Sequence, residues 1–94
     1  MAEWTFASSD PTEELAQLHV FSILIPQGDQ TIEFRITVYE YAVPNHLSMR
    51  FYAIADKQTN QKTAAFTPCG WGMTLLEALS LCVKAARLFP YEDA

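Results

Sequence analysis

Apolar and polar residues alternate through Thr31–Tyr41, "TIEFRITVYEY", and this pattern is the starting point for predicting the fold. One face of the segment carries Ile32, Phe34, Ile36 and Val38. The other face carries Glu33, Arg35, Thr37, Tyr39 and Tyr41. A period of two residues is typical of a strand that turns one face to a core. The segment is therefore predicted to be a central strand.

The preceding residues extend this strand into a hairpin. A two-residue turn at Gly28-Asp29 pairs Ile25 with Ile32 and Phe21 with Ile36. Apolar residues then meet on one face. A slip of one residue would turn every core side chain of a strand toward water, so this agreement favours the pairing.

A second turn, centred on Pro44-Asn45, continues the sheet into a third strand. This turn pairs Ile36 with Ala53 and places Tyr39 opposite Arg50. Residues 62–68, "KTAAFTP", are predicted to return as a fourth strand. The sequence thus predicts a four-stranded antiparallel meander with one apolar face.

A helix over residues 74–89 is predicted to cover the apolar face. Its core stripe comprises Leu75, Leu79, Cys82, Ala86 and Phe89. Thr74 and Glu77 have the spacing of a capping box, with Thr74 as N-cap and Glu77 at the third helical position.

A short helix is also predicted near the N-terminus, in residues 8–18, "SSDPTEELAQL". Asp10 is expected to cap it, with Pro11 at the first helical position and Glu13 and Glu14 favouring its N-terminal end. Leu15 and Leu18 are expected to face inward. The complete prediction is an α+β fold with the order α-β-β-β-β-α. Residues 1–94 form one domain, with residues 1–9 as an arm and residues 90–94 as a C-terminal tail.

Composition narrows the classes of function. The chain has 94 residues and a net charge of −5. This negative charge disfavours general nucleic-acid binding but leaves binding through a local basic face open. No apolar run approaches the ~20 residues of a membrane helix, and the N-terminus lacks the features of a signal peptide. We therefore expect a cytoplasmic protein without membrane association. Free thiols are favoured for Cys69 and Cys82, although their redox state stays open.

The segment Thr67–Ala78, "TPCGWGMTLLEA", invites comparison with a phosphate-binding loop. It lacks the lysine of a P-loop, and the Glu77 carboxylate is expected at the helix N-terminus, where a phosphate would bind. We predict instead a strand exit at Pro68 and a chain reversal through Gly70 and Gly72. Trp71 is expected to close the end of the sheet–helix sandwich or, alternatively, to join an interface.

Candidate catalytic groups are scattered. His19 and His46 fall at different places in the predicted sheet, and Cys69 has no predicted base beside it. No metal site, no cofactor and no enzymatic activity are expected.

Two surfaces are left without a partner in the predicted fold. Leu81 and Leu88 lie on the polar side of the C-terminal helix together with Lys84. Either a second subunit or the segment with Trp4 and Phe6 is expected to cover them.

The outer sheet face is the second such surface, with Arg35, Tyr39, Tyr41, Arg50 and Tyr52. Three interpretations apply: an ordinary exposed sheet, a protein-binding face, or a single-stranded nucleic-acid platform. The order of four strands and a helix is similar to the layout of Whirly-type single-stranded DNA-binding proteins, which dimerise through helices. This likeness concerns topology alone, and topology does not fix function.

The leading hypothesis is a small acidic, non-enzymatic regulatory or adaptor protein. We expect it to be a homodimer and to bind another protein, in particular one with a basic surface. The alternatives are a single-stranded nucleic-acid-binding protein that uses the Tyr/Arg face, and a small-molecule-binding module.

Overall fold

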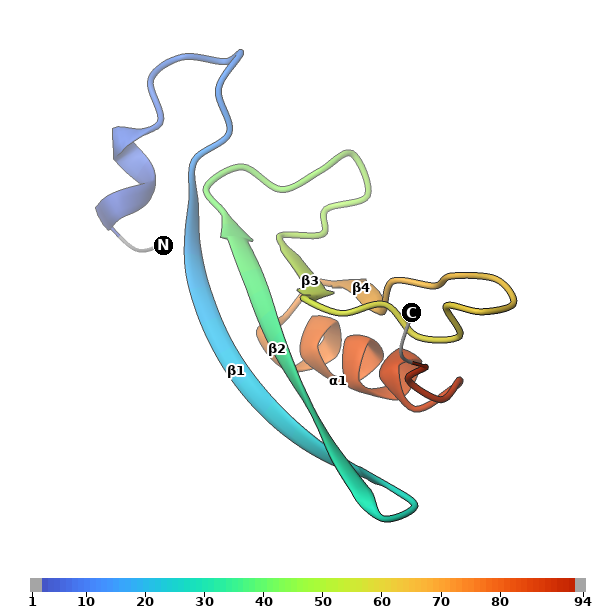
Figure 1. Cartoon of the computed structure of the whole chain (residues 1–94). Helices are drawn as coiled ribbons and strands as arrows, with labels where there is room; N and C mark the ends of the chain where they lie inside the picture. The colour runs from blue at the N-terminus through green and yellow to red at the C-terminus, as the bar shows by residue number, and fades with distance from the viewer. Residues whose placement is uncertain (1–2, 93–94) are drawn as a thin grey trace.

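The computed structural model describes residues 3–92 and has an α+β fold, as predicted (Figure 1). A short 3-10 helix is followed by a four-stranded antiparallel sheet in the order β1-β2-β3-β4, and by one C-terminal helix. The elements are η1 (Glu3–Ala7), β1 (Ala16–Gln27), β2 (Gln30–Tyr41), β3 (Phe51–Ala55), β4 (Cys69–Gly72) and α1 (Leu75–Ala86). The helix lies against one face of the sheet and leaves the other face uncovered by it.

The β1–β2 hairpin has the predicted register. Ile25 pairs with Ile32 and Phe21 pairs with Ile36. Gly28 in the turn has a φ of +62°, a left-handed conformation that glycine adopts without steric cost. The two-residue turn therefore fixes the pairing of both long strands.

The predicted register between β2 and β3 is wrong by two residues. Ile36 pairs with Ala55 rather than Ala53, and Tyr39 lies opposite Tyr52 rather than Arg50. The connection is longer than a tight turn at Pro44-Asn45, because the Asn45 side chain accepts the backbone amides of residues 47 and 49, at 2.9 and 3.0 Å. A shift of two residues keeps every side chain on its predicted face.

The fourth strand is also corrected. It is Cys69–Gly72, not residues 62–68, and it pairs Ala53 with Gly70 and Tyr52 with Trp71. Residues 62–68 belong to a connection, in which Phe66 forms an isolated bridge with Thr59. The segment predicted as a chain reversal is thus the edge strand on which the helix packs.

The two glycines of β4 allow this close packing. A Cβ atom at Gly70 would lie 2.7 Å from the Cβ of Leu81, and one at Gly72 would lie 2.7 Å from the backbone nitrogen of Ala78. Such contacts are far below normal van der Waals separation. Only glycine at these positions lets the helix approach the strand this closely.

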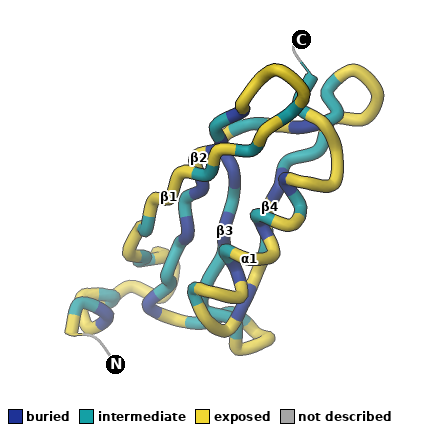
Figure 2. Tube along the Cα trace, turned by 90° about the horizontal axis from the view of Figure 1, so that it is seen from below, coloured by how far each residue is buried: buried dark blue, intermediate teal, exposed yellow. Residues whose placement is uncertain are grey.

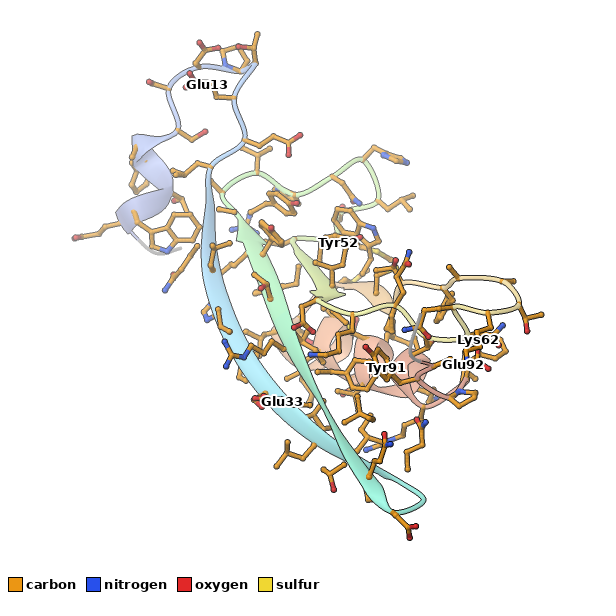
Figure 3. All side chains as sticks on the ribbon, in the orientation of Figure 1. Glu13, Glu33, Tyr52, Lys62, Tyr91 and Glu92 are labelled. Atoms are coloured by element: carbon orange, nitrogen blue, oxygen red, sulfur yellow. The ribbon has the colours of Figure 1, made fainter. Side chains whose placement is uncertain are left out.

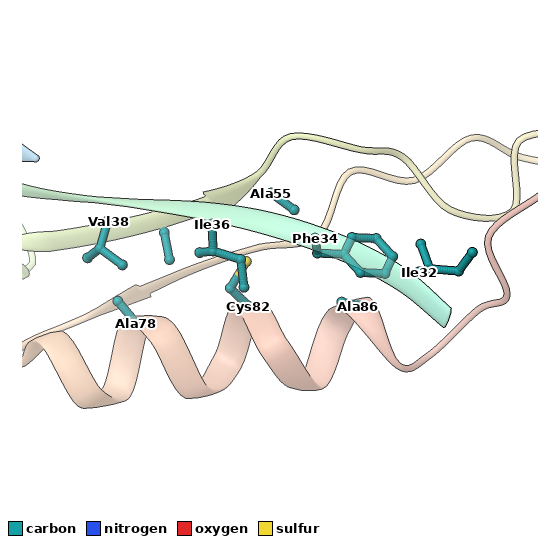
Figure 4. Packing of buried hydrophobic residues seen from close by; sticks show 9 residues of the cluster. Ile32, Phe34, Ile36, Val38, Ala55, Ala78, Cys82 and Ala86 are labelled. Carbon is teal, nitrogen blue, oxygen red and sulfur yellow. The ribbon is translucent and has the colours of Figure 1, made fainter. Parts of the chain in front are cut away.

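The core forms where large residues of β2 meet small residues of α1. Val38 lies over Ala78, Ile36 over Cys82 and Phe34 over Ala86 (Figure 4). Successive contact residues are four positions apart in the helix and two positions apart in the strand. These spacings correspond to rises of about 6 Å and about 6.7 Å, so the contact residues stay aligned along the interface.

The helix begins at its predicted cap and ends earlier than predicted. The backbone amide of Glu77 donates to the Thr74 hydroxyl at 3.1 Å, and the Glu77 carboxylate accepts the amide of Met73 at 3.1 Å. The last helical residue is Ala86, with Arg87 as C-cap. Phe89 therefore lies beyond the helix, where its ring contacts that of Phe66.

The N-terminal helix is misplaced in the prediction. The structure has a 3-10 helix at Glu3–Ala7, and residues from Ala16 onward belong to β1. The Asp10 carboxylate does not cap a helix but accepts the amide and hydroxyl of Thr12, at 2.9 and 2.7 Å. Leu18 consequently lies exposed on β1 instead of facing inward.

The C-terminal residues contact the rest of the fold. Tyr91 exchanges two hydrogen bonds with the side chain of Gln27, at 2.7 and 2.8 Å. The Glu92 carboxylate accepts the amide of Lys62 at 3.0 Å, and Figure 3 shows these two residues beside Tyr91. These bonds join the chain end to the β1–β2 hairpin and to the connection before β4.

Burial is uneven across the sheet. Buried residues gather in β2, β3 and α1, whereas every residue of β1 is exposed or only partly buried (Figure 2). Within residues 3–92, no helix has the length and apolar character needed to cross a membrane.

Candidate functional site

Four aromatic side chains form a continuous cluster on the outer face, the face of the sheet opposite α1. We call Tyr39, Tyr41, Tyr52 and Trp71 the aromatic cluster. The Tyr52 and Trp71 ring centroids lie 4.7 Å apart, and the Tyr41 and Trp71 centroids lie 6.0 Å apart. Tyr39 joins the cluster through Tyr41 at 5.9 Å and Tyr52 at 6.3 Å. All four separations fall in the range of favourable aromatic pairs.

The sheet register brings the cluster together from three strands. Alternate residues of β2 place Tyr39 and Tyr41 on the outer face, and Tyr52 of β3 lies opposite Tyr39. Trp71 of β4 lies opposite Tyr52 and is 39% exposed. Trp71 is therefore on the outer face and does not close the sheet–helix sandwich, contrary to the prediction.

The two predicted arginines lie at separate places on the outer face. Arg35 lies exposed on β2, with its Nε 3.7 Å from a carboxylate oxygen of Glu33. Arg50 precedes β3, and its carbonyl accepts the backbone amide of Tyr41 at 2.9 Å. The predicted cross-strand pair of Tyr39 and Arg50 is not formed. Arg50 instead lies opposite Tyr41, at the edge of the aromatic rings, so the rings are contiguous whereas the two arginines lie apart from each other.

A cavity of about 490 Å³ adjoins the aromatic cluster. Its walls come from the loop before β1 and from the loop after β2, which lie at the same end of the sheet (Figure 1). The lining comprises Ser8, Asp10, Pro11, Glu13, Glu14, Leu15, Tyr41, Val43, Pro44, Asn45 and Trp71. It contains three carboxylates, and none of these lining residues is a lysine, arginine or histidine. We call this feature the acidic cavity.

Backbone hydrogen bonds hold the walls of the acidic cavity together. The amide of Ala42 donates to the carbonyl of Leu15 at 2.8 Å, which joins the two loops. The bonds of Asp10 to Thr12 fix the bend of the first loop, and those of Asn45 fix the second. The cavity is therefore part of the folded structure.

The hydroxyl groups of two cluster residues titrate above their ordinary range. Burial raises the pKa of Tyr41, with a further contribution from the negative charge of Glu14. Burial also raises the pKa of Tyr52, and the nearby Cys69 thiol adds to the effect. Both phenols are therefore neutral hydrogen-bonding groups at neutral pH. Glu14 and Tyr41 both line the acidic cavity.

The predicted dimer surface with Leu81, Lys84 and Leu88 is exposed, but Leu88 follows the C-cap Arg87 and does not belong to the helix as predicted. Leu81 is 47% exposed and Leu88 is 64% exposed. The η1 helix, which carries Trp4 and Phe6, lies beside β1 away from α1 (Figure 1), and Phe6 is itself 78% exposed. The N-terminal segment does not cover the two leucines.

The histidine and cysteine side chains are dispersed over the fold, and Cys69 lies near Tyr52 of the aromatic cluster. His19 Nε2 is 2.8 Å from Glu40 Oε1. The sequence did not indicate this pair, because the two residues lie diagonally across β1 and β2 rather than directly opposite each other. Cys69 is exposed on the outer face, whereas Cys82 is buried between sheet and helix, where its thiol donates to the Pro68 carbonyl at 3.5 Å. Among residues 3–92, no three His, Cys, Asp or Glu side chains converge as metal ligands would.

The geometry defines one candidate site, made of the aromatic cluster and the adjoining acidic cavity. Tyr39, Tyr41 and Tyr52 were candidate residues from the sequence, whereas Trp71 and the three carboxylates were not. Comparisons of the chain with protein-family models, with curated proteins and with solved structures find no match.

Proposed function

We propose that this chain is a cytoplasmic, non-enzymatic regulatory or adaptor protein that binds another protein through its outer face. The observation that carries the proposal is the aromatic cluster, four rings that each pair with two of the others on a sheet face that the helix does not cover. Tyrosine and tryptophan dominate the energetics of many protein interfaces, because large rigid rings bury much area at low entropic cost.

The charge distribution supports a partner with a basic surface. The chain carries a net charge of −5, and three carboxylates line the cavity beside the cluster. Complementary charge speeds encounter with the right partner and penalises acidic competitors. Basic surfaces of this kind include the grooves of nucleic-acid-binding proteins.

Single-stranded nucleic acid is the second candidate, because bases can stack on the aromatic cluster. The charges around the cluster weigh against it. Arg50 lies opposite Tyr41 at the edge of the cluster. Arg35, however, lies beside Glu33, and the cavity presents Asp10, Glu13 and Glu14 to any phosphate backbone that crosses the sheet. Fluorescence anisotropy with a labelled oligonucleotide at low salt separates the two candidates. Tight binding that is lost in Arg50→Glu would favour nucleic acid.

We also propose that the chain forms a homodimer through Leu81 of α1 and Leu88, which follows the end of the helix. Both leucines are exposed, and Lys84 lies between them in the sequence. Light scattering coupled to size exclusion should give twice the chain mass for the wild type and the monomer mass for Leu81→Glu/Leu88→Glu. A wild-type monomer at high micromolar concentration would refute the dimer.

Affinity capture from the native host tests the binding face. The double variant Tyr52→Ala/Trp71→Ala removes the closest ring pair, and Leu76→Ala removes an exposed apolar side chain of the helix as a matched control. We expect the wild type and Leu76→Ala to recover the same specific proteins, and the double variant to lose them. Equal recovery by all three proteins would show that the outer face is not the binding surface.

A further inference from the structure

We infer that the acidic cavity receives a lysine or arginine side chain of the partner protein. This inference rests on the proposed protein-binding function and names the group that the site recognises. The cavity combines an aromatic floor with a rim of carboxylates, and each of these features favours a cation.

The floor of the cavity comes from the aromatic cluster. Tyr41 and Trp71 contribute to both, and their rings are nearly parallel, with 21° between the planes. A cation within about 6 Å of such a ring is attracted by its electron-rich face, most strongly over tryptophan. Trp71 is 39% exposed, so its ring has surface available to a ligand.

The rim of the cavity supplies negative charge. Hydrogen bonds from the side chain and the backbone of Thr12 lower the pKa of Asp10, which therefore stays ionised at neutral pH. The hydrogen bonds and ion pairs of the described residues do not engage the carboxylates of Glu13 and Glu14. Figure 3 shows Glu13 on the loop before β1 and Tyr52 on the sheet below it.

The same rim disfavours other ligand classes. A phosphate or carboxylate group would meet three negative charges and no positively charged lining residue. A neutral apolar group would contact the apolar lining residues Leu15, Val43 and Pro44 but would leave the carboxylates unpaired. A guanidinium or ammonium group pairs with the carboxylates and is attracted by the faces of the rings.

The position of the cavity favours a side chain of a protein over a free amine. The cavity shares Tyr41 and Trp71 with the aromatic cluster, and the cluster continues over β2 and β3 to Tyr39 and Tyr52. A partner segment can therefore lie across the cluster while one basic side chain enters the cavity. A free amine would use the cavity alone.

NMR titration of the ¹⁵N-labelled full chain tests this inference. The ligand is a blocked pentapeptide with the sequence Gly-Ser-Arg-Ser-Gly, and its neutral match contains citrulline in place of arginine. We expect the arginine peptide to shift the Trp71 indole N–H and the Tyr41 amide in a saturable way. The citrulline peptide should bind at least about tenfold more weakly, as expected when a charge-assisted contact is lost.

Substitutions in the rim give the second arm of the test. Glu13→Gln/Glu14→Gln changes two exposed side chains and leaves the fold intact, and we expect it to weaken arginine-peptide binding by about tenfold, from two surface charge contacts. Glu3→Gln/Glu92→Gln is the control, because it removes the same charge away from the cavity, and should leave binding within about twofold.

The outcomes separate this inference from the proposed function. Equal binding of the arginine and citrulline peptides, or unchanged binding by Glu13→Gln/Glu14→Gln, would overturn the inference. If capture of partners still depended on Tyr52 and Trp71, the proposed function would stand without it. Methylguanidinium binding as tightly as the arginine peptide would overturn the assignment to a protein side chain.

Discussion

The two glycines of β4 give the most specific structural prediction, because it concerns the sign of a stability change. At Gly72, a Cβ atom would lie 2.6 Å from the Cβ of Glu77 and 2.7 Å from the backbone nitrogen of Ala78. At Gly70 it would lie 2.7 Å from the Cβ of Leu81 and 3.0 Å from the carbonyl oxygen of Ala78. None of these atoms can rotate away, since they belong to the helix backbone or are attached directly to it.

Alanine at either glycine should therefore destabilise the fold. Carbon atoms pack at about 3.5–4.0 Å, so the start of α1 must move by about 1 Å to accept the new methyl group. Overpacking of this kind costs about 1–3 kcal/mol. Alanine also restricts the unfolded chain, which contributes about 0.4–1 kcal/mol in the opposite direction. We expect a net loss of about 1–2 kcal/mol in the free energy of unfolding.

Urea unfolding followed by far-UV circular dichroism measures this loss. With an m-value of about 1 kcal/mol/M, the midpoint of Gly70→Ala or Gly72→Ala should fall by about 1–2 M. Gly28→Ala is the control: its Cβ meets no atom within 4 Å, so its cost comes only from a φ of +62°. Gly28→Asn should recover part of that cost, because asparagine tolerates the left-handed region. If Gly70→Ala and Gly72→Ala matched or exceeded the wild type in stability, the close helix–strand contact would be refuted.

Three further predictions concern the helix cap and the thiols. Thr74→Ala should lower the free energy of unfolding by about 1 kcal/mol. Thr74→Ser should lower it by much less, because serine keeps the hydroxyl that accepts the Glu77 amide. Equal losses for the two variants in urea unfolding would contradict this role of Thr74. Iodoacetamide at pH 8 should alkylate exposed Cys69 within minutes and buried Cys82 only in urea. Peptide mass spectrometry measures the labelling of each cysteine. Equal labelling of the two without urea would mean that the helix does not cover Cys82. Burial raises the pKa of Cys82 to about 11, so the folded chain binds this proton more tightly than the unfolded chain. This tighter proton binding contributes roughly 2–3 kcal/mol to the free energy of unfolding. The contribution is fully present below about pH 8.5 and is lost as the pH rises to about 11. Cys82→Ala should show a smaller loss of stability over this interval, and an equal loss would exclude the thiol as the cause.

The sequence was sufficient to predict the faces of the sheet but not all of its pairings. The two-residue turn at Gly28 leaves one register for β1 and β2, and that register is correct. Between β2 and β3, apolar alternation excludes a slip of one residue but not of two, since a shift of two returns each side chain to its own face. The bonds of Asn45 that lengthen the connection are local, yet the sequence does not indicate which turn they form.

The fourth strand was missed for a different reason. Glycine is unfavourable in strands, so the Gly70-Trp71-Gly72 sequence resembles a turn when considered alone. Its role depends on the helix that packs against it, and that contact is tertiary. The same error hid Trp71 from the predicted outer face. Once β4 is placed correctly, Trp71 completes the aromatic cluster and reaches the acidic cavity.

The candidate carboxylates could not be found from local patterns. Glu13 and Glu14 appeared to support a helix N-terminus, because they follow Asp10 and Pro11. In the structure Asp10 closes a short turn with Thr12, and the chain then enters β1. That turn brings the carboxylates to the loop after β2, at the aromatic end of the sheet. The acidic cavity is thus a product of the tertiary fold.

The central claim is that the outer face binds a basic protein surface, and parallel NMR titrations test it most directly. One titration adds an arginine-rich peptide to the ¹⁵N-labelled chain, and the other adds a single-stranded oligothymidine. We predict saturable shifts at Tyr39, Tyr41, Tyr52 and Trp71 with the peptide, and no comparable shifts with the oligonucleotide. Tighter binding of the oligonucleotide at these residues, or peptide-induced shifts confined to α1, would contradict the claim.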